Sequence, residues 1–73
     1  MEERDRRLLD TLRQSNEELD RLWLEHGEFE AKLGALNKRH ARTPAEDQEI
    51  LRLKRLKLQG RDRIEAILSQ HRI

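Results

Sequence analysis

The chain has 73 residues, which is enough for one small domain. Charged residues make up 42% of it and hydrophobic residues 34%, and its aromatic residues are Trp23 and Phe29. This composition excludes a thick, many-layered core and favours a long helix or coiled coil that buries a narrow apolar stripe. Disorder fits the same composition, so the spacing of the apolar residues has to decide.

The balance of charge and the absence of cysteine exclude several classes of protein. The net charge is +1, so the whole chain has no excess charge to attract nucleic acid or an anionic membrane. Without cysteine it can form neither disulfides nor thiolate metal sites. No apolar run approaches the roughly 18 residues of a membrane span, and the charged start MEERDRR leads into no signal-like apolar segment. We therefore expect a cytoplasmic protein.

The first predicted element is a helix over about residues 3–40. Its evidence is a spacing that alternates four and three residues without a slip, as in a heptad repeat. The residues in this repeat are Leu8, Leu12, Ser15, Leu19, Leu22, His26, Phe29, Leu33, Leu36 and His40. Disorder does not produce such a pattern. A straight helix of this extent would be roughly 57 Å long at about 1.5 Å per residue.

The proline at position 44 predicts where that helix ends and a second one begins. Thr43 precedes proline, which disfavours helical dihedral angles at Thr43. Thr43 can then cap a new helix, with Pro44 in its first turn and Glu46 completing a capping box. We expect a turn at about 41–43 and a second helix over about 44–71.

A connection this short favours antiparallel neighbours. Folding at residue 42 brings the two apolar stripes together along one seam. The predicted seam consists of Leu19, Leu22, Trp23, His26, Phe29, Leu33, Leu36, Ile50, Leu53, Leu56, Gly60, Ile64 and Ile67. The charge distribution also favours this pairing. Residues 1–36 carry ten acidic and six basic side chains, whereas residues 37–73 carry five acidic and ten basic ones. The predicted fold is an all-α, coiled-coil-like antiparallel two-helix hairpin, a single unit over 1–73.

The second helix also resembles a known family. The run TPAEDQEILRLKRLKLQGRDRIEAIL, preceded by a Glu-His pair and a leucine, is similar to the YdcH-like family of small bacterial proteins. The residues that carry the resemblance are Glu25, His26, Leu33, Leu53, Lys54, Lys57, Leu58, Arg61, Asp62 and Ile64. The resemblance spans roughly 19–69. It implies a helical hairpin and supplies no activity.

Gly60 departs from that family's pattern, which tends to place leucine at this seam position. Glycine inside a helix costs about 1 kcal/mol relative to alanine. One hypothesis is that the indole of Trp23 fills the space left by the missing side chain. The alternative is a simple kink at Gly60.

Several leucines are predicted to lie outside the seam or beyond the end of the second helix. They are Leu8, Leu9, Leu24, Leu51, Leu58 and Leu68. A bare two-helix seam buries few apolar side chains, so a second hairpin could cover these leucines and close a four-helix bundle. We expect a weak homodimer, with fraying of the N-terminal overhang in a monomer as the alternative.

The run RLKRLK, residues 52–57, could lie along nucleic-acid phosphates. It has no aromatic residue to stack on a base, and the other interpretation is a solvated face that balances the acidic first half.

The histidines His26, His40 and His71 are never four residues apart, so no helix face presents a paired metal site. We expect packing roles for His26 and His40 at the seam, and no cofactor.

No motif typical of catalysis is visible, and a helical hairpin encloses no cleft. The sequence therefore predicts a non-enzymatic protein–protein interaction or self-association module. A nucleic-acid-associated protein using the second helix is the alternative.

Overall fold

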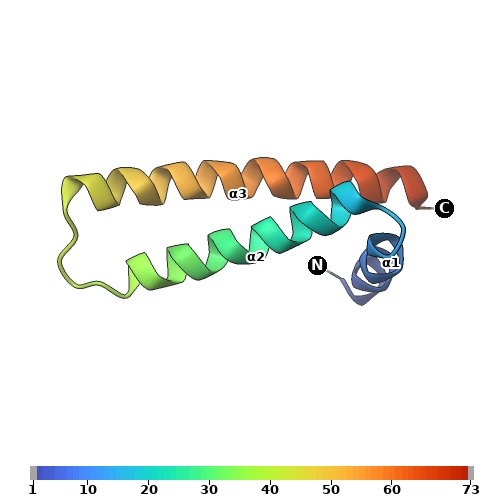
Figure 1. Cartoon of the computed structure of the whole chain (residues 1–73), viewed down its shortest axis with the longest axis horizontal. Coiled ribbons are helices and arrows are strands. Elements are labelled where there is room, and N and C mark those ends of the chain that lie inside the picture. The colour runs from blue at the N-terminus through green and yellow to red at the C-terminus, as the bar shows by residue number, and fades with distance from the viewer. Residues whose placement is uncertain (1, 73) are drawn as a thin grey trace.

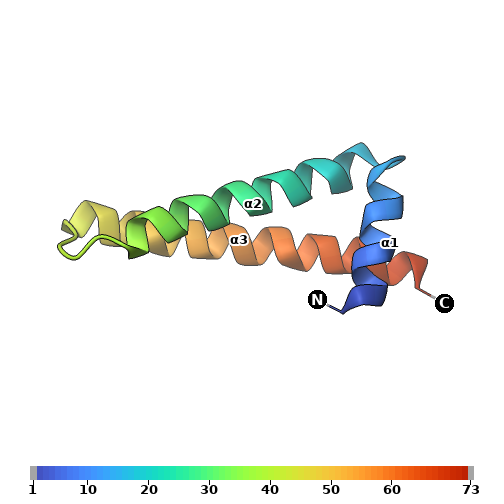
Figure 2. The same ribbon diagram turned by 90° about the horizontal axis from the view of Figure 1, so that it is seen from below.

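The computed structural model describes residues 2–72 and is all-α in that range, as the sequence predicted. It has three helices: α1 (Glu3–Arg13), α2 (Glu17–Asn37) and α3 (Pro44–His71). α2 and α3 lie side by side and antiparallel (Figure 1). α1 crosses the end of this pair that lies farthest from the connection between α2 and α3 (Figure 2).

The prediction of one continuous helix over 3–40 is wrong, because the chain breaks at residues 14–16. Asn16 is extended (φ −125°, ψ 99°), and its side-chain oxygen accepts a hydrogen bond from the Leu19 N–H at 3.0 Å. This N-cap satisfies one of the free donors that begin α2. Glu17 and Glu18 place negative charge in the same turn, where the helix dipole favours it.

The break lets α1 fold back across the pair instead of projecting beyond it. Leu9 is fully buried with Leu19 and Leu68, and Leu8 and Leu12 pack against the same cluster. The Cα atoms extend 47 Å along the longest axis, shorter than the roughly 57 Å expected of a straight helix over 3–40. The predicted overhang is therefore part of the core.

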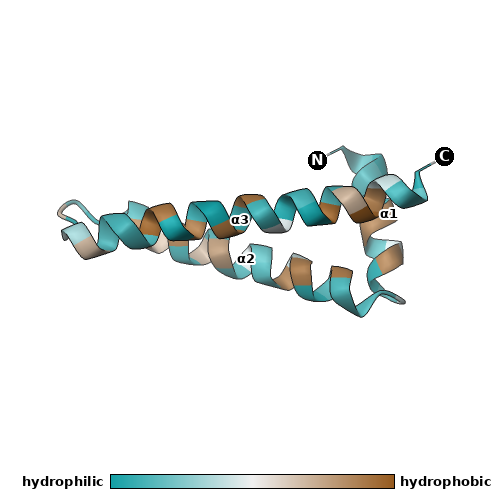
Figure 3. Cartoon of the chain, turned by 90° about the horizontal axis from the view of Figure 1, so that it is seen from above, coloured by the Kyte–Doolittle hydropathy of each residue, from teal (hydrophilic) through white to brown (hydrophobic). Residues whose placement is uncertain are grey.

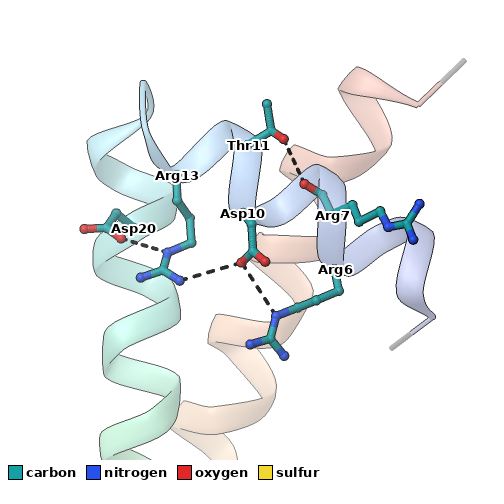
Figure 4. Close-up of polar contacts among 6 residues, drawn as sticks. All are labelled: Arg6, Arg7, Asp10, Thr11, Arg13 and Asp20. Carbon is teal, nitrogen blue, oxygen red and sulfur yellow. Dashed lines mark hydrogen bonds and ion pairs between the residues drawn. The ribbon is translucent and has the colours of Figure 1, made fainter.

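Polar contacts fix the position of α1 at both of its ends. Next to the break, Arg13 Nε donates to Asp20 Oδ1 at 2.8 Å, which ties α1 to α2 (Figure 4). Near the N-terminus, the Arg6 guanidinium lies 5.1 Å from the centre of the Trp23 ring. Arg72 at the end of α3 donates to Asp5 Oδ1 at 3.0 Å. α1 is thus joined to both of the other helices.

The connection between α2 and α3 is longer than predicted, because α2 ends at Asn37 rather than near residue 40. The second helix was predicted over 44–71, and α3 spans Pro44–His71. The Thr43 hydroxyl accepts from the Glu46 N–H at 3.2 Å, and a Glu46 carboxylate oxygen accepts from the Thr43 N–H at 3.1 Å. Together they form a capping box.

The buried side chains form two separate clusters along the pair. The cluster at the α1 end contains Leu9, Leu19, Ile64, Ile67 and Leu68, with Leu8, Leu12, Leu22 and Trp23 packed on it. The cluster near the connection contains Leu33, Ile50 and Leu53, with Phe29 and Leu36 packed on it. Ion pairs between helices follow the charge asymmetry of the sequence, since Glu18 contacts Arg63 at 2.9 Å and Glu30 contacts Lys57 at 3.2 Å.

The hypothesis that Trp23 fills the space beside Gly60 is wrong. A Cβ atom placed at Gly60 would have no heavy-atom neighbour within 4 Å. Trp23 packs instead on the cluster at the α1 end. An open hollow of about 230 Å³ lies beside Gly60 and is lined by Leu22, Glu25, His26, Phe29, Leu56, Lys57 and Gln59. α3 continues through Gly60 without interruption.

Replacement of Thr43 tests the capping box. Thr43→Ala should lower the free energy of unfolding by about 1 kcal/mol, because the Glu46 N–H loses its acceptor. Thr43→Ser keeps that acceptor and serves as the control. Chemical denaturation measures both, and equal stability of the two variants would contradict a role for the hydroxyl.

Replacement of Gly60 tests the open space beside it. Gly60→Ala should raise the free energy of unfolding by about 1 kcal/mol, because the new methyl group meets no neighbour and alanine is the better helix former. Gly27→Ala is a matched control, since a Cβ there also meets nothing within 4 Å. A loss of stability in the Gly60 variant alone would mean that the site is tighter than the structure shows.

Candidate functional site

One face of the α2–α3 pair carries a shallow groove that we call the α2–α3 groove. It has a volume of about 590 Å³. α2 contributes Glu30, Leu33, Gly34 and Asn37, and α3 contributes Lys54, Lys57, Leu58 and Arg61. Leu33 is buried beneath it, and a Cβ atom at Gly34 would have no neighbour within 4 Å. The groove is therefore open above an apolar floor.

Three of the six leucines predicted to face a partner are exposed. Leu24, Leu51 and Leu58 are 54%, 48% and 58% exposed. Leu51 and Leu58 are seven residues apart and so lie on the same face of α3, whereas Leu24 lies on α2 among charged neighbours. Figure 3 shows hydrophobic bands along α3 that alternate with hydrophilic ones. Large apolar side chains on α3 are thus presented to solvent between charges.

For two of the other three leucines, Leu9 and Leu68, the prediction of a partner surface is wrong. Leu9 and Leu68 are fully buried, and Leu8 is half-buried against the same cluster. Leu8 and Leu9 belong to α1, which folds back so that they pack on the cluster containing Leu68. The sequence placed Leu68 outside the seam correctly, but the residue is covered by α1 and not by a second molecule.

The charges along the groove are only partly balanced. Lys57 Nζ lies 3.2 Å from Glu30 Oε1, whereas Lys54 and Arg61 make no ion pair with any residue in the range 2–72. The pKa of Glu30 lies below its ordinary value of 4.5, mainly because Lys57 donates a hydrogen bond to the carboxylate. Desolvation of the carboxylate opposes this, and the nearby charges of Lys57 and His26 add to the lowering. The groove thus keeps two unbalanced positive charges.

The histidines do not come together. His26 stacks on Trp23, with ring centres 5.8 Å apart, and its Nε2 lies 3.3 Å from Glu30 Oε1. Its Nδ1 is buried without a hydrogen-bond partner among the described residues. His40 was expected at the seam, but it is exposed in the connection after α2 because α2 ends early, and His71 is exposed at the end of α3. Residues 2–72 contain no group of three or more His, Cys, Asp or Glu side chains that could hold a metal ion.

The residues that carry the family resemblance divide between the core and the groove. Leu53 and Ile64 are buried, whereas Lys54, Lys57, Leu58 and Arg61 line the groove. On the α2 side of the groove, Gly34 belongs to a patch of small residues, with Gly27, Ala31 and Ala35, that the sequence assigns either to a solvated face or to close approach of a neighbour. Asn37 was not predicted.

These features define the class of the protein. It is a small all-helical protein whose helices pack through two apolar clusters, and no helix among residues 2–72 has the length and apolar character needed to cross a membrane.

The family described as "Protein of unknown function (DUF465)" matches residues 19–68, and the chain belongs to this family. The YdcH-like proteins indicated by the sequence are members of it, so that resemblance is confirmed. The matched range contains most of α2 and most of α3 and excludes α1. Neither a curated protein nor a solved structure matches the chain.

The contact between Glu30 and Lys57 predicts a pH effect. Since the pKa of Glu30 is lower in the folded state than the ordinary 4.5, its ionised form stabilises the fold above that pH. This stabilisation is lost as the pH falls through the folded-state pKa. It is small, because the Glu30 side chain is 54% exposed. In a carboxyl carbon NMR titration, Glu30 should titrate below 4.5, and Lys57→Gln should raise its pKa. An unchanged midpoint in that variant would contradict the assigned cause.

Proposed function

We propose that this chain is a protein-binding module that presents its binding surface on α3 and the adjoining groove. The observation that carries the proposal is Leu58, which is 58% exposed at the wall of the groove. Leu51, seven residues earlier, extends the same apolar line. Single exposed leucines are ordinary on protein surfaces, but two leucines on one face of a helix, one of them at an open groove, are spaced to contact another helix.

A homodimer is less well supported than the sequence suggested, because two of the leucines expected to form the dimer contact are buried within the chain. The leucines expected to drive it included Leu8, Leu9 and Leu68, and these now pack against one another within the chain. The two-helix seam expected to be marginal alone is extended by α1. The proposed partner is therefore a different protein, and association with a second copy is an outcome that sedimentation equilibrium can detect.

The alternative of nucleic-acid binding through α3 is less well supported. Half of the basic side chains in the run 52–57 are engaged within the protein, since Arg52 bonds Glu49 and Lys57 contacts Glu30; beyond the run, Arg63 bonds Glu18. Trp23 and Phe29 are partly buried against the two clusters, and Trp23 already stacks on His26 and lies under Arg6, which limits stacking on bases. Salt-dependent retention on DNA or RNA would support this alternative.

Photocrosslinking tests protein binding in the cell of origin. A photoreactive residue at position 58 should form a discrete adduct with another protein, while the same residue at position 59 should not. Gln59 is exposed like Leu58 but lines the hollow beside Gly60 and not the groove.

Leu58→Glu supplies the matching loss of function. It should abolish the association, because a carboxylate cannot be buried against an apolar partner without a large desolvation penalty. Gln59→Glu adds the same negative charge outside the groove and should leave the association intact. Absence of any adduct at position 58, or equal effects of the two substitutions, would contradict the proposal. An adduct between two copies of this chain would make the partner a second copy.

A further inference from the structure

The α2–α3 groove continues along the seam until it meets α1. A second hollow of about 270 Å³ shares Glu30, Lys57 and Arg61 with the groove and extends it to Trp23 and Glu65. At that end Glu65 and Asp5 both contact Arg72, and Arg6 lies over Trp23, so α1 lies next to two residues that line this hollow. From Lys54 to Glu65 the open face is about 16 Å long at the helical rise. That length fits about three turns of a docked helix.

The chemistry along this length is apolar in the middle and positive on the α3 side. Leu33 lies beneath the centre and Leu58 beside it. Lys54 and Arg61 lie four residues before and three residues after Leu58, and neither forms an ion pair in the described range. On the opposite side, Gly34 has no side chain to keep a second helix away. The carboxylate of Glu30 is already engaged with Lys57.

We propose that the groove binds an acidic amphipathic helix of another protein, which deepens the proposed function and rests on it. Apolar side chains on one face of that helix cover Leu58 and Leu33. Two carboxylates seven residues apart pair with Lys54 and Arg61, which have the same spacing. The two positive charges fix the orientation and the preference for an acidic partner, while burial of Leu58, which is 58% exposed, supplies the apolar contribution.

A second copy of the chain does not suit this groove. Two copies can stack groove to groove about a two-fold axis that lies along the groove or across it. With the axis along the groove, the copies run in the same direction and both place α1 at the same end of the pair, where it crosses α2 and α3 (Figure 2). When they run in opposite directions, α3 faces α3, which brings Lys54 opposite Arg61 of the other copy. Repulsion between these like charges disfavours the second orientation.

Two labelled peptides of about four helical turns test the inference with the full chain. Both carry leucine at alternating three- and four-residue spacing, and glutamate in one is replaced by lysine in the other. Fluorescence anisotropy at low salt should show about tenfold or more tighter binding of the glutamate peptide, with a preference that weakens as salt is added. The double variant Lys54→Glu with Arg61→Glu should reverse the preference.

The matched control is Arg4→Glu with Lys32→Glu, which changes the net charge equally at exposed positions on α1 and α2 outside the groove. It should keep the glutamate preference. Circular dichroism checks that both double variants remain helical. Equal binding of the two peptides, absence of binding, or reversal by the control would overturn the inference. Crosslinking at position 58 to a partner without an acidic helix would also overturn it, while leaving the protein-binding proposal intact.

Discussion

The burial of Leu9 against Leu19 and Leu68 is the contact on which the rest of the structure depends. Two antiparallel helices bury side chains along a single seam. A side chain beside that seam, such as Leu68, stays exposed to solvent unless a third element covers it. α1 is that element, and with it Leu9, Leu19 and Leu68 all reach 0% exposure. A domain this small has little apolar area to bury. The added contact therefore contributes a substantial share of its stability.

The antiparallel arrangement of α2 and α3 could be predicted from two sequence patterns. The heptad spacing orients the apolar residues of α2 and α3, and Thr43, Pro44 and Glu46 mark the start of α3. The break at Asn16 could not be read from the same spacing, because the four–three alternation is identical in a continuous helix and in two helices that meet at residue 16. The competing signals were Asn16 itself and the acidic residues after it, which are typical of a helix start.

The exposed leucines were predicted only in part, because apolar spacing shows which residues leave the α2–α3 seam but not which of them α1 covers. Leu24, Leu51 and Leu58 lie outside the seam of the α2–α3 pair and are exposed, since no other element covers them. Leu9 and Leu68 were misassigned because their burial depends on where α1 folds, which is a tertiary effect. The pairing of Lys57 with Glu30, and the absence of such a pair for Lys54 and Arg61, depends on side-chain reach across the seam. Register alone does not determine it.

The separation of the core into two clusters also affects how the molecule opens. Between them lie Gly60, which has no side chain, and the hollow beside it, so little apolar contact couples the end near the connection to the end under α1. Local opening follows contiguous packing units. The connection and the start of α3 can therefore fray while Leu9 and Leu68 stay packed, and amide protons at the two ends exchange with solvent through separate fluctuations.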